Sequence, residues 1–382
     1  MKNLFIITLL LSSLLSFGQT RTLSNDAEIS ILTCSPGPQL HEIFGHSAIR
    51  FHDDKNHIDW VFNYGTFRFD TPNFYVKFVR GNLDYMLAAT NYKNFINAYK
   101  DERSVYEQTL NLDSISKQKI FDAIIINYKP ENKYYKYEFQ LDNCATRIRD
   151  IVDDNVSSTI TYGFPDQDKT FRDILKEYLV PIRWTDWGIN TLLGRRLDHM
   201  ASTKDYMYIP DYVMHLYDSA SINNEPLVRT KKIIQAPQTI FPTPWYFGPE
   251  LAFSLLFVLV LAYSVRCIKK KRISRWIDYI LFSVVGLVGI VLFFMCFFSD
   301  YNSTAWNYNL LFFTPTHLIA LFFLHKRESV WLKRYFWLCL IACFHAIGLF
   351  YLLPIGGQAL PWASLPLILI ISLRSYMIAK NK

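Results

Sequence analysis

The C-terminal third of the 382-residue chain is almost continuously apolar, and no other feature constrains the fold as strongly. Five apolar stretches follow one another, near residues 246–265, 276–298, 306–324, 335–353 and 359–376. Each is close to the roughly 20 residues that a helix needs to cross the hydrocarbon core of a bilayer. The sequence therefore predicts an all-α membrane domain of five transmembrane helices at residues 246–382.

The charges between these stretches predict how the membrane domain is oriented. Residues 266–275 carry six Lys or Arg and residues 325–334 carry four, whereas residues 299–305 and 354–358 carry none. Because positively charged loops stay in the cytoplasm, the two loops without Lys or Arg and the N-terminal part of the chain are expected outside. Arg374, in the last stretch, is expected to reach towards the cytoplasmic surface.

The rest of the chain has the composition of an ordinary globular protein. From residue 246 onward 13 basic residues stand against 4 acidic ones, while the preceding part carries 27 basic and 29 acidic residues. The net charge of +7 thus comes from the membrane loops and gives no indication of nucleic-acid binding. We expect an exported domain at residues 19–218 and, where Asn and Pro accumulate, a linker at residues 219–245.

Residues 1–18 have the pattern of a secretory signal peptide. Lys2 supplies the positive charge, Leu4 to Leu15 form the apolar core, and small residues end at Gly18, where a signal peptidase cuts. The alternative is an uncleaved anchor helix, although the apolar run is short for a span. In both cases the domain that follows lies outside the cytoplasm.

The exported part contains two cysteines, Cys34 and Cys144. Asp142 and Asn143 are good N-cap residues, and residues 148–152 have helical apolar spacing, so Cys144 is expected in the first turn of a helix. Unpaired N–H groups and the helix dipole favour a thiolate there, which is the nucleophilic form of cysteine. The alternatives are a small buried apolar side chain or a disulfide between the two cysteines.

A histidine-containing hairpin is expected upstream of Cys144. His41 and His46 are five residues apart with Gly45 between them, whereas a zinc-binding helix needs its histidines four apart, so we expect no metal site. From His46 onward the alternation is typical of a strand, and Ile58–Tyr64 predicts a second one. Pairing of the two strands would place Asn63 or a near neighbour beside His46.

Four further polar residues are candidates for binding a substrate. Arg50 and Arg147 can hold a phosphate, with pairing to core carboxylates as the alternative. Asn307 and Asn309 lie at the outer mouth of the third apolar stretch, where polar groups at membrane depth are often functional. The alternative for these two is a solvated loop followed by helix capping.

A cysteine at a helix start, a histidine on a strand and a polar residue on the next strand can form a triad. The segments Gly45–Arg50, Phe62–Gly65 and Asn143–Arg147 resemble the circularly permuted papain-like (NlpC-type) superfamily, which includes lecithin:retinol acyltransferase. The whole chain is similar to the Lnb family of bacterial lipoprotein N-acyltransferases. These pair such an α+β domain with a C-terminal block of membrane helices.

The resemblance implies roles for particular residues and a reaction. Cys144 is the expected nucleophile and His46 the base, with Asn63 as the third member unless the strand register brings Asp59 there instead. An acyl chain would move from a phospholipid, through a cysteine thioester, to the N-terminal diacylglyceryl-cysteine of a lipoprotein. The N–H groups of Cys144 and Ala145 are expected to stabilise the oxyanion, and no cofactor is expected. The expected location is the bacterial inner membrane, with several spans and the catalytic domain in the periplasm.

Other functions fit parts of the same pattern. A membrane-anchored cysteine peptidase or amidase acting on peptidoglycan needs only an anchor, so five spans count against it. A phospholipase of the same fold would pass the acyl chain to water. A non-enzymatic assembly factor would join Cys34 and Cys144 in a disulfide.

Overall fold

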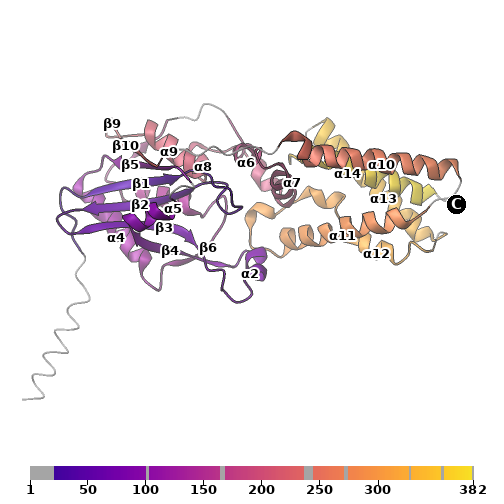
Figure 1. Ribbon diagram of the computed structural model, residues 1–382, viewed down its shortest axis with the longest axis horizontal. Coiled ribbons are helices and arrows are strands. Elements are labelled where there is room, and N and C mark those ends of the chain that lie inside the picture. Colours follow the sequence, from indigo (N-terminus) through magenta and orange to yellow (C-terminus); the bar gives the residue numbers. More distant parts are fainter. Residues whose placement is uncertain are drawn as a thin grey trace, which may run out of the picture.

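The computed structural model is elongated, with a mixed α/β domain at one end and a helical domain at the other (Figure 1). The structure describes residues 21–99, 103–163, 168–235, 244–270, 274–326, 328–353 and 357–380. The expected signal peptide at residues 1–18 lies outside the described residues.

A seven-stranded antiparallel sheet forms the centre of the N-terminal domain, in the order β10-β5-β1-β2-β3-β4-β6. Its strands are β1 (Glu28–Cys34), β2 (His46–Asp53), β3 (Ile58–Thr66), β4 (Asp84–Asn91), β5 (Val105–Leu110), β6 (Tyr134–Lys136) and β10 (Val228–Gln235). The expected hairpin is confirmed as β2–β3, in which Ile49 pairs with Phe62 and Asp53 with Ile58.

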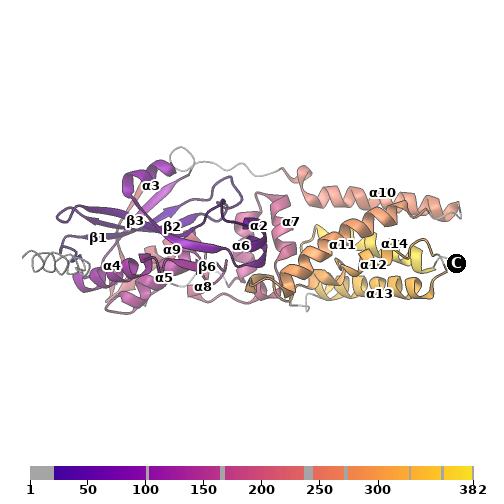
Figure 2. The same cartoon turned by 90° about the horizontal axis from the view of Figure 1, so that it is seen from below.

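Helices cover the sheet and build the core of this domain (Figure 2). They are α2 (Phe74–Arg80), α3 (Tyr92–Ala98), α4 (Ser114–Tyr128), α5 (Cys144–Asn155), α6 (Phe171–Leu179), α7 (Arg183–Leu192), α8 (Thr203–Tyr206) and α9 (Pro210–Ser219), with a 3-10 turn at Arg195–Asp198. Phe51 of the sheet packs edge to face on Phe62 and on Phe121 of α4, at 5.8 and 5.1 Å between ring centroids. Burying a side chain of this size stabilises the fold by about 1.5–3 kcal/mol.

Part of the expected linker belongs to the folded domain instead. Strand β8 (Ser221–Ile222) pairs with β7 (Ile160–Thr161) and β9 (Glu225–Pro226) in a small second sheet, and β10 adds to the edge of the large one. Lysines in β10 are typical of an edge strand, which they protect from further pairing. The prolines that suggested a linker lie partly in residues 236–243, outside the described residues.

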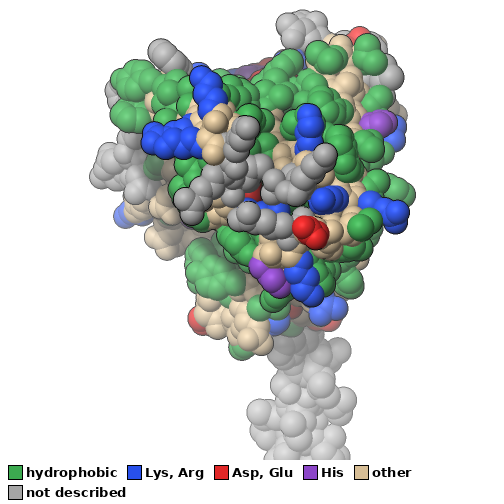
Figure 3. All heavy atoms as spheres, turned by 90° about the vertical axis from the view of Figure 1, so that its right-hand side faces the viewer, with side chains coloured by type: hydrophobic (Ala, Val, Ile, Leu, Met, Phe, Trp, Pro, Cys, Tyr) green, Lys and Arg blue, Asp and Glu red, His purple; other side chains and the backbone are tan. Residues whose placement is uncertain are grey.

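The helical domain contains three helices, among the described residues, that are long and apolar enough to cross a membrane. They are α10 (Pro249–Lys269), α11 (Trp276–Phe297) and a continuous helix of α13 (Val330–Ala346) and the π-helical turn Ile347–Leu352. A further apolar helix, α14 (Ser364–Lys380), packs along α10 and α13. Lys and Arg side chains gather at the end of this domain that faces away from the sheet (Figure 3), as the positive-inside rule predicts for a cytoplasmic end.

The third expected span, at residues 306–324, is not one helix. It contains a 3-10 turn at Tyr308–Leu311 and a short helix, α12 (Thr316–Leu321), after another 3-10 turn at Asn302–Thr304. The Asn307 side chain bonds the backbone N–H of Asn309 (3.0 Å) and so competes with helix formation. Pro315 has no N–H to give to a preceding helical turn. Such irregular backbone is tolerated at membrane depth only where protein surrounds it.

Arg374 is buried rather than extended towards the membrane surface. Its Nε and Nη2 donate to Asp278 (2.6 and 2.9 Å), and its Nη1 donates to Ser264 (3.0 Å). The arginine thereby joins α14 to α11 and α10. The reason is that the Asp278 carboxylate lies within reach. A guanidinium paired with it inside the bundle costs less free energy than an unpaired guanidinium that crosses lipid to reach the surface.

Candidate active site

Helix α5 begins at Cys144 because Asn143 caps it. The Asn143 Oδ1 accepts hydrogen bonds from the N–H groups of Ala145 (2.8 Å) and Thr146 (3.0 Å), and the Thr146 hydroxyl accepts from the Asn143 N–H (2.8 Å). The Asn143 Nδ2 donates to the carbonyl of Tyr208 (2.8 Å). This buried asparagine therefore fixes both the helix start and its position against the domain core, as the capping pattern predicts.

The start of β2 meets the start of α5. The backbone N–H of Ser47 hydrogen-bonds the Cys144 thiol, and the Asn63 side chain hydrogen-bonds His46. The cysteine thus contacts the residue that follows His46 in β2, and Asn63 contacts His46 itself. Asp59 lies towards the other end of β3, opposite His52, so the register favours Asn63 beside the histidine.

Burial and charge set the protonation states at this site. Burial lowers the pKa of His46 to about 4, helped by the nearby charge of Arg103 and opposed by the Asn63 hydrogen bond. Burial also raises the pKa of the Cys144 thiol, and the N–H groups around the sulfur only partly oppose this. The expected thiolate at the helix start is therefore wrong for the resting site, since desolvation outweighs the helix terminus. The resting site therefore holds a protonated Cys144 thiol and a neutral His46 imidazole.

Arg103 is a part of the site that sequence analysis missed. Its buried side chain donates from Nε to the Ser35 carbonyl (2.6 Å), pairs with Glu42 (3.7 Å) and lies 4.9 Å from the Tyr99 ring centroid. Its charge lowers the pKa of both Cys144 and His46. In the sequence it stands in a polar run before β5, where nothing distinguishes it from a turn residue.

An aromatic wall stands beside the cysteine. A negative charge on Cys144 would raise the pKa of Tyr137, so the two side chains interact electrostatically. The Tyr137 ring stacks on that of Tyr85, with 4.6 Å between the ring centroids. The backbone of Gly65 lies next to Cys144, since a Cβ added at Gly65 would lie 3.7 Å from the Cys144 Cβ. Its φ of +88° is a conformation that glycine adopts most readily. The cysteine is half-buried among these apolar neighbours.

All six cysteines, each of which lies in a described segment, are free. Cys34 is buried in the sheet opposite His46, and burial raises the pKa of its thiol to about 12. It is thus an inert thiol, and the disulfide with Cys144 required by the assembly-factor alternative is not formed. His41 lies apart, against the ring of Phe67, and within the described ranges no cluster of three or more His, Cys, Asp or Glu is suited to a metal ion.

Two family models match the chain. The Lnb N-terminal periplasmic domain matches residues 16–177, which include all three residues of the site, and the Lnb transmembrane domain matches residues 242–382. The protein belongs to the Lnb family. It is therefore a membrane protein with a periplasmic domain, from a family of lipoprotein-processing enzymes that implies an acyltransferase role. No curated protein and no solved structure gives a match.

In this member of the Lnb family the two candidate arginines are already paired. Arg50 donates to Asp59 (2.7 Å) and Glu107 (2.8 Å) and stacks on a tyrosine ring. Arg147 forms a bidentate pair with Asp142 and lies 3.7 Å from the centroid of the Tyr135 ring. The alternative expected for both residues, pairing with carboxylates, thus describes their contacts.

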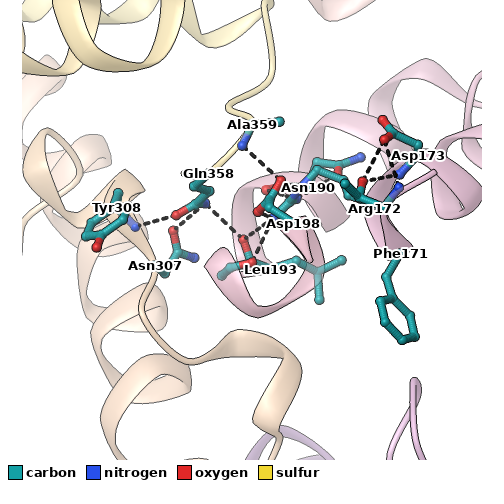
Figure 4. A network of polar contacts seen from close by, with 12 residues as sticks. Phe171, Arg172, Asp173, Asn190, Leu193, Asp198, Asn307, Tyr308, Gln358 and Ala359 are labelled. Carbon is teal, nitrogen blue, oxygen red and sulfur yellow. Dashed lines mark hydrogen bonds and ion pairs between the residues drawn. The ribbon is translucent and has the colours of Figure 1, made fainter. Parts of the chain in front are cut away.

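Asn307 and Asn309 hold the two domains of the Lnb protein together. Both side chains are buried and donate to the Thr191 carbonyl, at 2.8 and 3.1 Å, where α7 ends. Around them Gln358 donates to the Leu193 carbonyl (3.2 Å) and accepts from the backbone N–H of residue 308 (Figure 4). Their hydrogen bonds fix α7 to the periplasmic mouth of the helical domain.

The helical domain contains a predominantly apolar pocket of about 490 Å³. It lies between α10, α11 and α14, below Trp187 of α7, and its lining includes Phe253 and Val260. This volume is within the range of ligand sites, and the lining offers few polar groups that would orient a water-soluble ligand.

Proposed function

We propose that this protein moves an acyl chain from a phospholipid to the N-terminal diacylglyceryl-cysteine of lipoproteins, through a thioester on Cys144. The observation that supports this proposal is the hydrogen bond from the Ser47 N–H to the Cys144 thiol, because Ser47 directly follows His46 in β2. Family membership supports a lipoprotein as the acceptor. We also infer a circularly permuted papain-like fold, because the histidine strand precedes the cysteine helix.

The first step forms the thioester. Neutral His46 takes the proton of Cys144 as the sulfur attacks the ester carbonyl, while Asn63 accepts a hydrogen bond from the N–H of the other ring nitrogen and fixes the tautomer. The carbonyl oxygen becomes an oxyanion. The N–H groups of Ser47, Ala145 and Cys144 all approach the sulfur, but the Ala145 N–H also donates to the capping Asn143, so those of Ser47 and Cys144 are the better donors. Collapse releases a lysophospholipid, whose oxygen takes the proton from His46.

The second step uses the α-amino group of the lipoprotein as the nucleophile. His46 takes a proton from the amine as it attacks the thioester and returns it to the departing Cys144 sulfur. Water must be kept out between the steps, or the thioester is hydrolysed and the enzyme acts as a phospholipase. The apolar surroundings of the half-buried cysteine favour exclusion of water.

The membrane domain supports lipid substrates in this scheme. The apolar cavity beneath Trp187 is suited to an acyl chain, which needs no polar partner. The gathering of basic side chains at the opposite end of the bundle supports a cytoplasmic location for that end. We infer that the protein resides in the bacterial inner membrane, with Cys144 on the periplasmic side.

The test is to incubate the full-length protein in phospholipid vesicles and to analyse peptides containing Cys144 by mass spectrometry. We expect an acyl adduct on Cys144 that is lost when a diacylglyceryl lipopeptide is added and becomes N-acylated. Cys144→Ala and His46→Ala should abolish both signals, and Cys34→Ala is the matched thiol control that should keep them. Lipopeptide N-acylation by Cys144→Ala would overturn the assignment. Release of free fatty acid with no N-acylation would indicate a phospholipase.

A further inference from the structure

Helix α2 (Phe74–Arg80) exposes an apolar face although it belongs to the periplasmic domain. Tyr75 is 79% exposed and Val76 65%, with Val79 exposed beside them on the same side of the helix. None of the residues of α2 is buried. An exposed apolar cluster of this kind normally marks a surface that another apolar phase covers.

Helix α2 lies at the periplasmic end of a membrane-spanning helix. The backbone N–H of Asp300, three residues after α11 ends, donates to the Arg80 carbonyl (2.8 Å). Gly81, with φ of +77°, allows this approach, since an added Cβ would lie 3.0 Å from the Tyr301 nitrogen. Both ribbon views place α2 beside this end of the helical domain (Figures 1 and 2). Because α11 spans the bilayer, α2 lies at its outer surface.

Other side chains mark the same depth. Trp306, in the loop that docks near α2, is exposed, and so are Trp362 and Trp184 on neighbouring segments at this end of the helical domain. Exposed tryptophans gather at the headgroup level of membranes. Lys77 and Arg80 in the last turn of α2 add positive charge, which suits contact with phospholipid headgroups. The occupant that fits this face is therefore the outer leaflet and not a soluble protein.

The inner side of α2 leads towards the nucleophile. Phe74 lies 5.8 Å from Phe67 between ring centroids, Phe67 lies 5.3 Å from Tyr85, and Tyr85 stacks on Tyr137 at 4.6 Å. Tyr137 is the neighbour of Cys144 in the aromatic wall. One run of aromatic rings thus leads from the bilayer surface to Tyr137, which interacts electrostatically with Cys144.

We propose that α2 inserts its Tyr75–Val79 face into the outer leaflet and that the phospholipid donor reaches Cys144 from there along the aromatic wall. The membrane contact of α2 stands on geometry alone, whereas the path of the donor rests on the proposed function. A portal at this place lets the ester group leave the headgroup region while the acyl chains remain among apolar side chains.

The membrane contact is tested by photo-crosslinking in the full-length protein. Benzoylphenylalanine replaces Tyr75 or, as the control, Ile115, which is 64% exposed on α4, a helix that both ribbon views place away from the membrane helices (Figures 1 and 2). After illumination in vesicles of phosphatidylethanolamine and phosphatidylglycerol, we expect phospholipid adducts at position 75 and none at position 115. Equal lipid labelling at the two positions, or crosslinks at position 75 to protein only, would overturn the proposal.

The donor path is tested by replacing the exposed face with Tyr75→Ser, Val76→Ser and Val79→Ser together. Acylation of Cys144 from bilayer phospholipid should fall about tenfold or more, because membrane contact scales with buried apolar area. Alkylation of Cys144 by iodoacetamide needs no lipid, and an unchanged alkylation rate would report that the site remains folded, since unfolding would expose the thiol and speed the reaction. Ile115→Ser is the matched control and should match the unchanged protein.

The outcomes of this test separate the two proposals. If the unchanged protein forms no acyl-Cys144 from phospholipid, the proposed function fails, while crosslinking still decides the membrane contact. If the unchanged protein is acylated and the triple variant is acylated equally fast, the path along α2 is refuted and the proposed function stands.

Discussion

Formation of the acyl-enzyme should continue at acidic pH, where an ordinary histidine base would be protonated. Burial and the charge of Arg103 both disfavour the imidazolium, so His46 remains neutral until the pH falls to about 4. At about pH 5, an imidazole with a pKa near 6.5 is only about 3% neutral, whereas one with a pKa near 4 is about 90% neutral. The two cases therefore differ roughly thirtyfold in the fraction of competent base.

The assay is a single-turnover measurement of acyl-Cys144 formation in phospholipid vesicles between about pH 4 and 9. It isolates the first step, so protonation of the acceptor amine does not affect the result. We expect an acid limb centred near pH 4, in line with the lowered pKa of His46. A limb centred near 6.5 would refute the reasoning, because it would mean that water reaches the imidazole or that another group is the base.

The contribution of Arg103 can be separated with three variants. Arg103→Gln removes a charge that lowers the pKa of His46, so the acid limb should move to higher pH, and Arg103→Lys should restore most of its position. Arg68→Gln is the control, since that arginine is exposed and pairs only with Asp70 at the surface. A limb that stays in place in Arg103→Gln would show that the arginine has a structural role only.

Three further predictions concern the nucleophile, its helix and the membrane bundle. Cys144→Ser should reduce acyl transfer to near background in the vesicle assay, because a hydroxyl is a far weaker nucleophile than a thiol with the same base; activity within tenfold of the unchanged protein would argue against thiol catalysis. Asn143→Ala should lower the free energy of unfolding by about 1–2 kcal/mol through loss of the cap, and should lower acyl transfer further than heat stability suggests; intact activity would mean that another contact positions the helix. Asp278→Asn should destabilise the bundle by roughly 3–5 kcal/mol, seen as a lower Tm in detergent, because Arg374 keeps a buried charge without its counterion; the double variant with Arg374→Met should recover part of the loss, and no recovery would contradict this account.

The sequence predicted those parts of the site that depend on local chemistry. A capping asparagine before Cys144 and two alternating strands around a polar turn are short-range signals, and both elements formed where expected. The arrangement around them is non-local. Arg103 and Tyr137 reach the cysteine through the order of strands in the sheet, which no pattern of spacing within the chain reveals. The prediction of a thiolate at Cys144 was wrong for the same reason, because the burial that raises the pKa of the thiol depends on neighbours from the whole domain.

In the membrane domain, hydropathy found the apolar stretches but not their shape. An average over a window does not register that Asn307 and Pro315 interrupt the third stretch, because the apolar residues around them dominate the sum. The asparagines were recognised as unusual, yet their partners are backbone carbonyls at the end of α7, which carry no sequence signature. In β10, the lysines of an edge strand lowered the apolar content and hid its alternation.

Hydrogen bonds between the domains connect the start of α5 to the membrane bundle. Glu138 accepts a hydrogen bond from the backbone N–H of Asn302 (2.8 Å), in the loop that follows α11. The Glu138 backbone also pairs with that of Asp142, two residues before Cys144, in a tight turn. The loop after α11 thus holds, through Asn302, the residues that lead into α5. Through Asp300, two residues before Asn302, the same loop bonds the end of α2. The helix that carries the sulfur and the helix at the bilayer surface are therefore positioned by one loop, so a shift of that loop would change the distance between lipid and nucleophile.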